Sequence, residues 1–256
     1  DGYGRSDQEW TKNYSYGISD EWDSAKSKLL PREPQHGYVE TPDYASYLNC
    51  SAETFSNAAA LLGQRVRIYG ANSPELKDWL NAQETVFKNC LHKEGDPVFL
   101  PEPVKLDKVA LKNDRAYQTA SAYFYAGDHK EARKRFAEIG ENTRSPYAKL
   151  ARYLVIRCYV REGLRQEAYS KPQEEIFRTA EAAALKIIND PAMAGIYAPT
   201  KRLLNLVRYR IAPEKELARL GAFFSGKWNS DGSDWNTAMR DYSNLVKNHV
   251  LKDAPQ

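Results

Sequence analysis

Apolar residues recur along most of this chain at the three- and four-residue intervals of amphipathic helices. No stretch shows the two-residue alternation that is typical of a strand. We expect helices over residues 114–126, from 128, from 146, over 174–189, from 199, from 213 and over 235–251. The pattern therefore predicts a chain that is almost entirely α-helical.

The clearest apolar stripe belongs to the helix expected to begin at Pro146. Its predicted inner positions are Tyr147, Leu150, Ala151, Leu154, Val155, Cys158 and Tyr159. Cys158 is interpreted as an inert core thiol, because no reactive motif surrounds it. The last helix has a similar stripe but no following helix to cover it. Its predicted inner positions are Met239, Tyr242, Leu245, Val246 and Val250.

A helical hairpin is predicted earlier in the chain. Residues 51–69 form one arm and residues 74–90 the other, with Ser73 as N-cap before Pro74. The arms have nearly equal length, so the start of one lies beside the end of the other. Cys50 and Cys90 would then meet, and we expect a disulfide and hence an oxidising compartment. The alternative is two buried thiols in a reducing compartment.

Residues 113–146 resemble a tetratricopeptide repeat. The positions that carry the resemblance are Ala120, Tyr123, Gly127, Ala132, Phe136 and Pro146, whereas Ala116 occupies the early Trp position. Small residues let the helices approach and aromatic residues fill the gaps between them. We therefore expect stacked antiparallel helical hairpins in an irregular tetratricopeptide-like superhelix.

A wider resemblance covers roughly residues 45 to 225. It rests on NCSAETFSNAAALLGQRVRIYGANSPELKDWLNAQETVFKNC, DRAYQTASAYFYAGDHKEARKRFAEI and SPYAKLARYLVIRCYVREG. These stretches are similar to a family of exported bacterial proteins described as hypothetical or tetratricopeptide-like. The resemblance implies a fold and a bacterial periplasmic or secreted location, and it implies no activity.

Residues 1–49 are rich in aromatic residues and poor in aliphatic ones, so they cannot build a core alone. We expect an extended arm that wraps the helical body with its rings as anchors; a carbohydrate-stacking face is the alternative. The predicted division is 1–49 arm, 50–90 disulfide-linked hairpin, 91–113 linker and 114–256 repeat region.

Composition narrows the function classes. The 37 basic and 34 acidic residues leave a net charge of +3, too small to favour nucleic acid. No apolar run is long enough for a transmembrane segment. The chain begins at Asp1 without an initiator Met, which fits a processed exported protein or a trimmed chain.

Motifs for catalysis, metals or cofactors are not found. The four histidines lack ligand spacing, and no nucleotide or hydrolase fingerprint occurs. An acidic cluster around Trp22 is interpreted as a solvated face, and the loop residues Asn229, Asp231, Ser233 and Asp234 as a turn rather than a calcium site. A basic patch fits a solvated surface or a docking face for an acidic partner. It comprises Arg133, Lys134, Arg135, Arg144, Lys149 and Arg152.

The leading hypothesis is a non-enzymatic α-helical scaffold that binds a protein partner or assembles with itself. The alternative is a carbohydrate- or cell-wall-associated protein of the superhelical lytic-transglycosylase type; catalysis is left open, and its absence is favoured. The interface is expected to use the aromatic arm or the last helix, unless the arm covers that helix within one monomer. The candidate interaction residues are Tyr14, Tyr16, Trp22, Trp235 and Tyr242.

Overall fold

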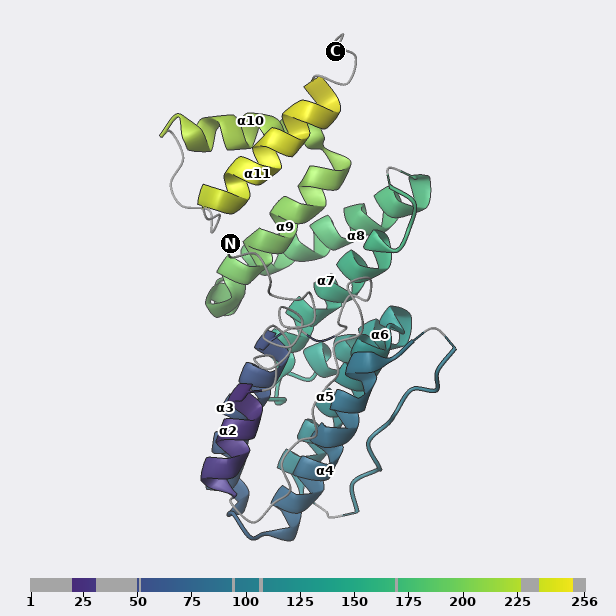
Figure 1. Ribbon diagram of the computed structural model, residues 1–256, viewed down its shortest axis with the longest axis vertical. Coiled ribbons are helices and arrows are strands. Elements are labelled where there is room, and N and C mark those ends of the chain that lie inside the picture. The colour runs from purple at the N-terminus through teal and green to yellow at the C-terminus, as the bar shows by residue number, and fades with distance from the viewer. Residues whose placement is uncertain are drawn as a thin grey trace, which may run out of the picture. The chain divides into compact units, whose positions relative to one another are not determined.

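The computed structural model describes residues 20–30, 50, 52–93, 95–105, 108–168, 170–226 and 235–250. These residues form helices and connections without a strand (Figure 1), which confirms the predicted all-α fold of helical hairpins. The chain divides into two compact units, residues 1–132 and 133–256. The predicted repeat region, 114–256, therefore begins inside the first unit.

The first unit contains a three-helix assembly and a further helix, α5. Its elements are α2 (Asp20–Leu29), α3 (Ala52–Tyr69), α4 (Pro74–Lys88), the short turn η1 (Asn89–Leu91), α5 (Val109–Ala126) and the first turn of α6 (His129–Glu141). The hairpin of α3 and α4 is confirmed. The Ser73 hydroxyl accepts a hydrogen bond from the Leu76 N–H, so it caps α4 as predicted.

The core of this unit lies between the hairpin and α2. Leu76, Trp79, Leu80 and Phe87 of α4 are buried together with Phe55 and Leu62 of α3. Trp22 of α2 is fully buried here, with its ring centroid 5.3 Å from Phe87 and 6.2 Å from Trp79. Part of the predicted extended arm is thus a helix, because Trp22 supplies the apolar contact that a short helix needs.

One predicted boundary differs from the structure. The helix expected from Asp114 begins five residues earlier, at Val109, so that residues 109–113 belong to α5 and not to the linker. Asp114 lies within α5, where it is buried and bonded to Arg65 and Tyr69 of α3. The connection before α5 is held at Asn89, whose side-chain amide donates to the Phe99 carbonyl and accepts from the Phe99 N–H.

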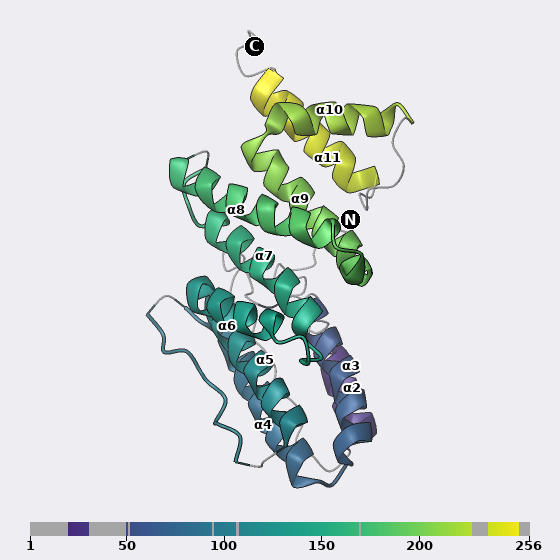
Figure 2. The same ribbon diagram turned by 180° about the vertical axis from the view of Figure 1, so that it is seen from behind.

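The second unit stacks helices that follow one another in the chain. After the rest of α6 come α7 (Ala148–Leu164), α8 (Lys171–Ile188), the turn η2 (Pro191–Ile196), α9 (Tyr197–Ile211), α10 (Pro213–Phe224), α11 (Trp235–Leu245) and the π-helical turn η3 (Val246–Val250). Figure 2 shows α7, α8 and α9 packed in that order. Phe177, Ala180 and Ala184 of α8 are fully buried in this stack.

The predicted stripe of α7 is correct only in part. Ala151, Leu154 and Cys158 are buried, but Leu150 is 36% exposed. Ile156 and Val160, which lie off the predicted stripe, are buried in the core that α7 shares with α8 and α9. Since α7 has cover on two sides, its buried surface is wider than one stripe.

The difference between two leucines of α7 gives a matched test. Leu154 is 7% exposed and Leu150 is 36% exposed. Leu154→Ala should lower the free energy of unfolding by about 2–5 kcal/mol, because it leaves a cavity. Leu150→Ala should cost below about 1 kcal/mol. Chemical denaturation measures both; equal losses would contradict this account of α7.

The predicted disulfide joins Cys50 to Cys90, and Cys158 is a free buried thiol. The bond closes a segment with a sequence separation of 40. On the chain-entropy model, it stabilises the fold by about 4 kcal/mol.

Cysteine chemistry should follow this arrangement. Peptide mapping of unreduced protein should recover Cys50 linked to Cys90. Burial raises the pKa of the Cys158 thiol to about 12. The folded protein should therefore keep this thiol protonated at about pH 8 and resist alkylation until it unfolds. Three free thiols in unreduced material, or rapid labelling of folded protein, would contradict the prediction.

Candidate functional site

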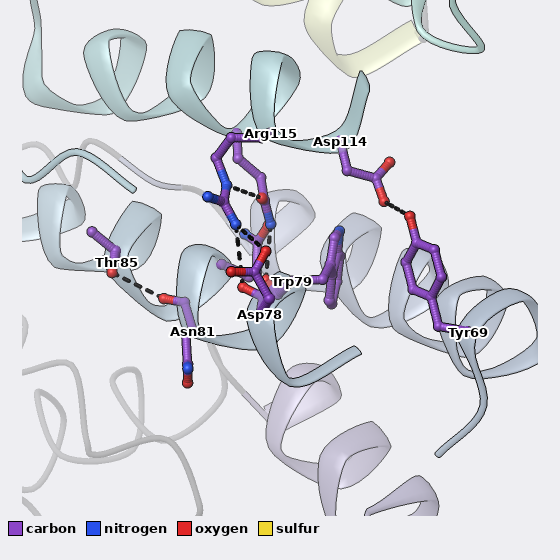
Figure 3. A network of polar contacts seen from close by, with 9 residues as sticks. Tyr69, Asp78, Trp79, Asn81, Thr85, Asp114 and Arg115 are labelled. Carbon is purple, nitrogen blue, oxygen red and sulfur yellow. Dashed lines mark hydrogen bonds and ion pairs between the residues drawn. The ribbon is translucent and has the colours of Figure 1, made fainter. Parts of the chain in front are cut away.

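A buried polar network in the first unit contains its closest ion pairs. Arg65 of α3 donates to both carboxylate oxygens of Asp114 of α5, at 2.6 Å each. The Tyr69 hydroxyl donates to the same carboxylate at 2.9 Å (Figure 3). Burial and the neighbouring Asp114 carboxylate raise the pKa of the Tyr69 phenol, which keeps it protonated as a donor.

The next residues along α5 bind the other arm of the hairpin. Figure 3 shows the Arg115 guanidinium pointing at Asp78, and its Nη2 lies 2.6 Å from Asp78 Oδ2. The Gln118 amide donates to the Trp79 carbonyl at 3.0 Å. These side chains bind one another and the backbone. We therefore interpret the network as the attachment of the hairpin to α5, not as a reaction centre.

Removal of Asp114 should test this attachment. Asp114 is 1% exposed, so Asp114→Ala removes the carboxylate that pairs with the buried Arg65 guanidinium. We expect a loss of about 3–5 kcal/mol in the free energy of unfolding. The control is Asp78→Ala, because the Asp78 side chain is 30% exposed and the buried Arg115 keeps its hydrogen bonds to the Asp78 carbonyl and to Gln118. Asp78→Ala should lower the free energy of unfolding by less than Asp114→Ala does. A small loss of similar size in both variants would contradict the interpretation.

A second candidate lies at the C-terminal end, on α10 and α11. An aromatic cluster is formed there by Phe223, Phe224, Trp235 and Tyr242. The Phe224 ring is 4.9 Å from Trp235 and 5.4 Å from Tyr242, both edge to face, and Phe223 is 5.9 Å from Trp235. Such edge-to-face contacts fix the orientation of the rings.

The apolar side of α11 around this cluster is only partly covered. Ala238 and Leu245 are buried with Leu220 of α10, whereas Trp235 is 55% and Met239 42% exposed. Trp and Met side chains that face water together on one helix are typical of a surface that another molecule covers. The described part of the chain therefore presents an apolar surface at its last helix.

The predicted interaction residues do not all lie on one surface of the described structure. The cluster brings Trp235 and Tyr242 together through Phe224. Trp22 is buried in the chain's own core, so it anchors α2 and is not exposed to a partner. Tyr14 and Tyr16 lie outside the described residues.

Sequence reasoning did not single out Phe223 or the exposure of Met239. The pair Phe223–Phe224 directly before a Gly-containing loop was the available signal for an aromatic helix end. Met239 had been expected on the inner face of the last helix, but it lies beside the part that α10 covers.

The other groups that the sequence singled out form no metal cluster within the described part of the chain. The described residues contain no cluster of His, Cys, Asp or Glu that could hold a metal ion. Trp22 and Lys26, beside the acidic residues of α2, both donate to Glu84. The loop with Asn229 and Asp231 lies outside the described ranges.

The basic patch is used partly within the chain. Arg133 pairs with Glu162 and lies 4.3 Å from the Tyr159 ring centre. Arg152 donates to the Gly140 carbonyl at 2.9 Å. These contacts join α6 to α7, so the two arginines have a structural role. Arg144, Lys149 and Lys134 are exposed.

Comparisons with known proteins give no relative. No family model matches the chain, and neither a curated protein nor a solved structure matches it. The resemblance to exported tetratricopeptide-like proteins therefore stays a prediction. Among the described residues, no helix is long and apolar enough to cross a membrane.

Proposed function

We propose that this protein is a non-enzymatic helical scaffold that binds a helical segment of another protein through the exposed face of α11. The observation that carries the proposal is the exposure of Trp235 and Met239, with the Trp235 ring packed edge to face on Phe224. Binding another helix would give this apolar face the cover that α10 gives to Ala238 and Leu245.

The nature of the exposed residues supports a protein partner. Trp is among the residues that contribute most to protein interfaces, and Met adapts its shape to different partners. Trp235 rests edge-on against Phe224, so its ring loses little freedom on binding. A preorganised Trp next to an adaptable Met favours a specific partner helix.

The proposed setting is the periplasm or the outside of the cell. A disulfide between Cys50 and Cys90 persists in an oxidising compartment. Export and a bacterial source are parts of the same proposal, and the disulfide supports the first of them.

A carbohydrate ligand is the second candidate, and Trp235 favours it. Sugar rings stack on exposed aromatic faces, and Trp235 is half exposed and held in place by Phe224. A soluble cell-wall glycopeptide titrated against the protein should quench tryptophan fluorescence if this candidate is correct. The same titration with Trp235→Ala should then show no quenching.

Photo-crosslinking tests the leading proposal. Benzoylphenylalanine placed at Met239 and expressed in the natural source should form one dominant protein adduct, because this position lies in the proposed contact. The adduct should be lost when Trp235→Ala is added. The measurement is the mass of crosslinked species after denaturing electrophoresis.

The matched control places the same crosslinker at Asn244. This residue is exposed on α11 but points away from Trp235 and Met239, given the helical spacing. It should form no such adduct. Equal adducts at positions 239 and 244, or none at 239, would exclude the proposed binding face.

A further inference from the structure

The exposed apolar residues of α11 follow a regular spacing. Trp235, Met239 and Tyr242 of α11 and Val246, the first residue of η3, are separated by four, three and four residues, and we call them the α11 seam. This spacing places them in one row along the helix. Tyr242 and Val246 are half-buried, whereas Trp235 and Met239 are exposed. The row is therefore shaped to pack along a second helix.

The two flanks of the α11 seam differ. On one flank, Ala238 and Leu245 are buried in the cluster with Leu220 of α10. Helical geometry places Asn236, Ser243, Arg240 and Lys247 on the other flank, and all four are exposed. Helix α10 occupies the flank with Ala238 and Leu245, so an incoming helix would approach the α11 seam from the open flank.

The charge on the open flank is positive. Arg240 and Lys247 lie two turns apart, and their long stems can reach beyond the short Asn236 and Ser243. The Arg240 side chain is 70% exposed and has Asp241, its chain neighbour, at 3.7 Å. Asp241 is the one acidic residue among residues 235–250.

The second unit as a whole also has an excess of positive charge. Residues 133–256 contain 22 lysines and arginines against 14 acidic residues, whereas residues 1–132 contain 15 against 20. A negatively charged partner would be steered towards the second unit.

Building on the proposed function, we infer that the α11 seam binds an amphipathic helix whose flank is acidic. Its apolar row would cover Trp235 and Met239, and its Asp or Glu residues would pair with Arg240 and Lys247. A second copy of α11 fits poorly. In an antiparallel pair, Arg240 and Lys247 of one copy would face Arg240 and Lys247 of the other copy and repel them. In a parallel pair, the open flank of one copy would face the flank of the other copy that α10 already occupies.

Two synthetic peptides test the inference on the intact chain. Both have roughly 20 residues and a row of Leu at the same four-three spacing, long enough to form a helix. One has Glu on both flanks and the other has Lys. Fluorescence anisotropy of the labelled peptides measures binding. The Glu peptide should bind about tenfold more tightly, as two exposed charge pairs replace two repulsions.

Variants separate the charge from the apolar row. Arg240→Glu with Lys247→Glu should reverse the preference, and Met239→Glu should weaken both peptides. All three positions are exposed, so folding should persist, as thermal melting by circular dichroism would verify.

The outcomes distinguish the inference from the proposed function. If both peptides bind equally and Met239→Glu abolishes that binding, the inference of an acidic partner is wrong but the proposed binding face is supported. Binding that ignores Met239→Glu would overturn both. A dimer in light scattering that Met239→Glu dissolves would show self-pairing and overturn the inference.

Discussion

Each helix of this chain must bury an apolar stripe, and the cover comes mainly from helices that adjoin it in sequence. The centre of the second unit satisfies this requirement: α8 lies between α7 and α9, and Phe177, Ala180 and Ala184 are sealed there. Helix α11 is covered less fully: α10 buries Ala238 and Leu245, whereas Trp235 and Met239 are exposed.

The first unit meets the same requirement with different means. Its hairpin gains a third helix from the N-terminal segment, and Trp22 fills the space beside Phe87. Polar contacts then attach α5, through Arg65 to Asp114 and through Arg115 to Asp78. Buried ion pairs of this kind are costly to break, so they hold α5 in one register against the hairpin. The disulfide adds a covalent tie at the open end.

Local signals allowed much of the fold to be predicted. Helical spacing and the Ser73 cap both agree with the structure. The two paired cysteines followed from equal arm lengths. Errors arose where a residue's role depends on distant parts of the chain. Asp114 resembled a helix start, but Arg65, 49 residues away, uses its carboxylate.

The candidate site shows the same limit. Periodicity placed Met239 on an inner face, because spacing reports an apolar row and not which part of it a neighbour covers. Leu150 on α7 is a second example. Exposure depends on how far the covering helix reaches, and α10 buries Ala238 and Leu245 but leaves Trp235 and Met239 largely exposed. Trp235 and Tyr242 could be selected from sequence; their contact through Phe224 required the structure.

The account's central claim is that α11 is the binding face and that its partner is an acidic helix. Amide hydrogen exchange of the intact chain, with and without the Glu-flanked peptide, tests it most directly. We expect slower exchange in residues 235–250 and in α10, with no change in α8, which is already enclosed. Protection confined to α6 and α7, or spread evenly over the chain, would contradict the claim.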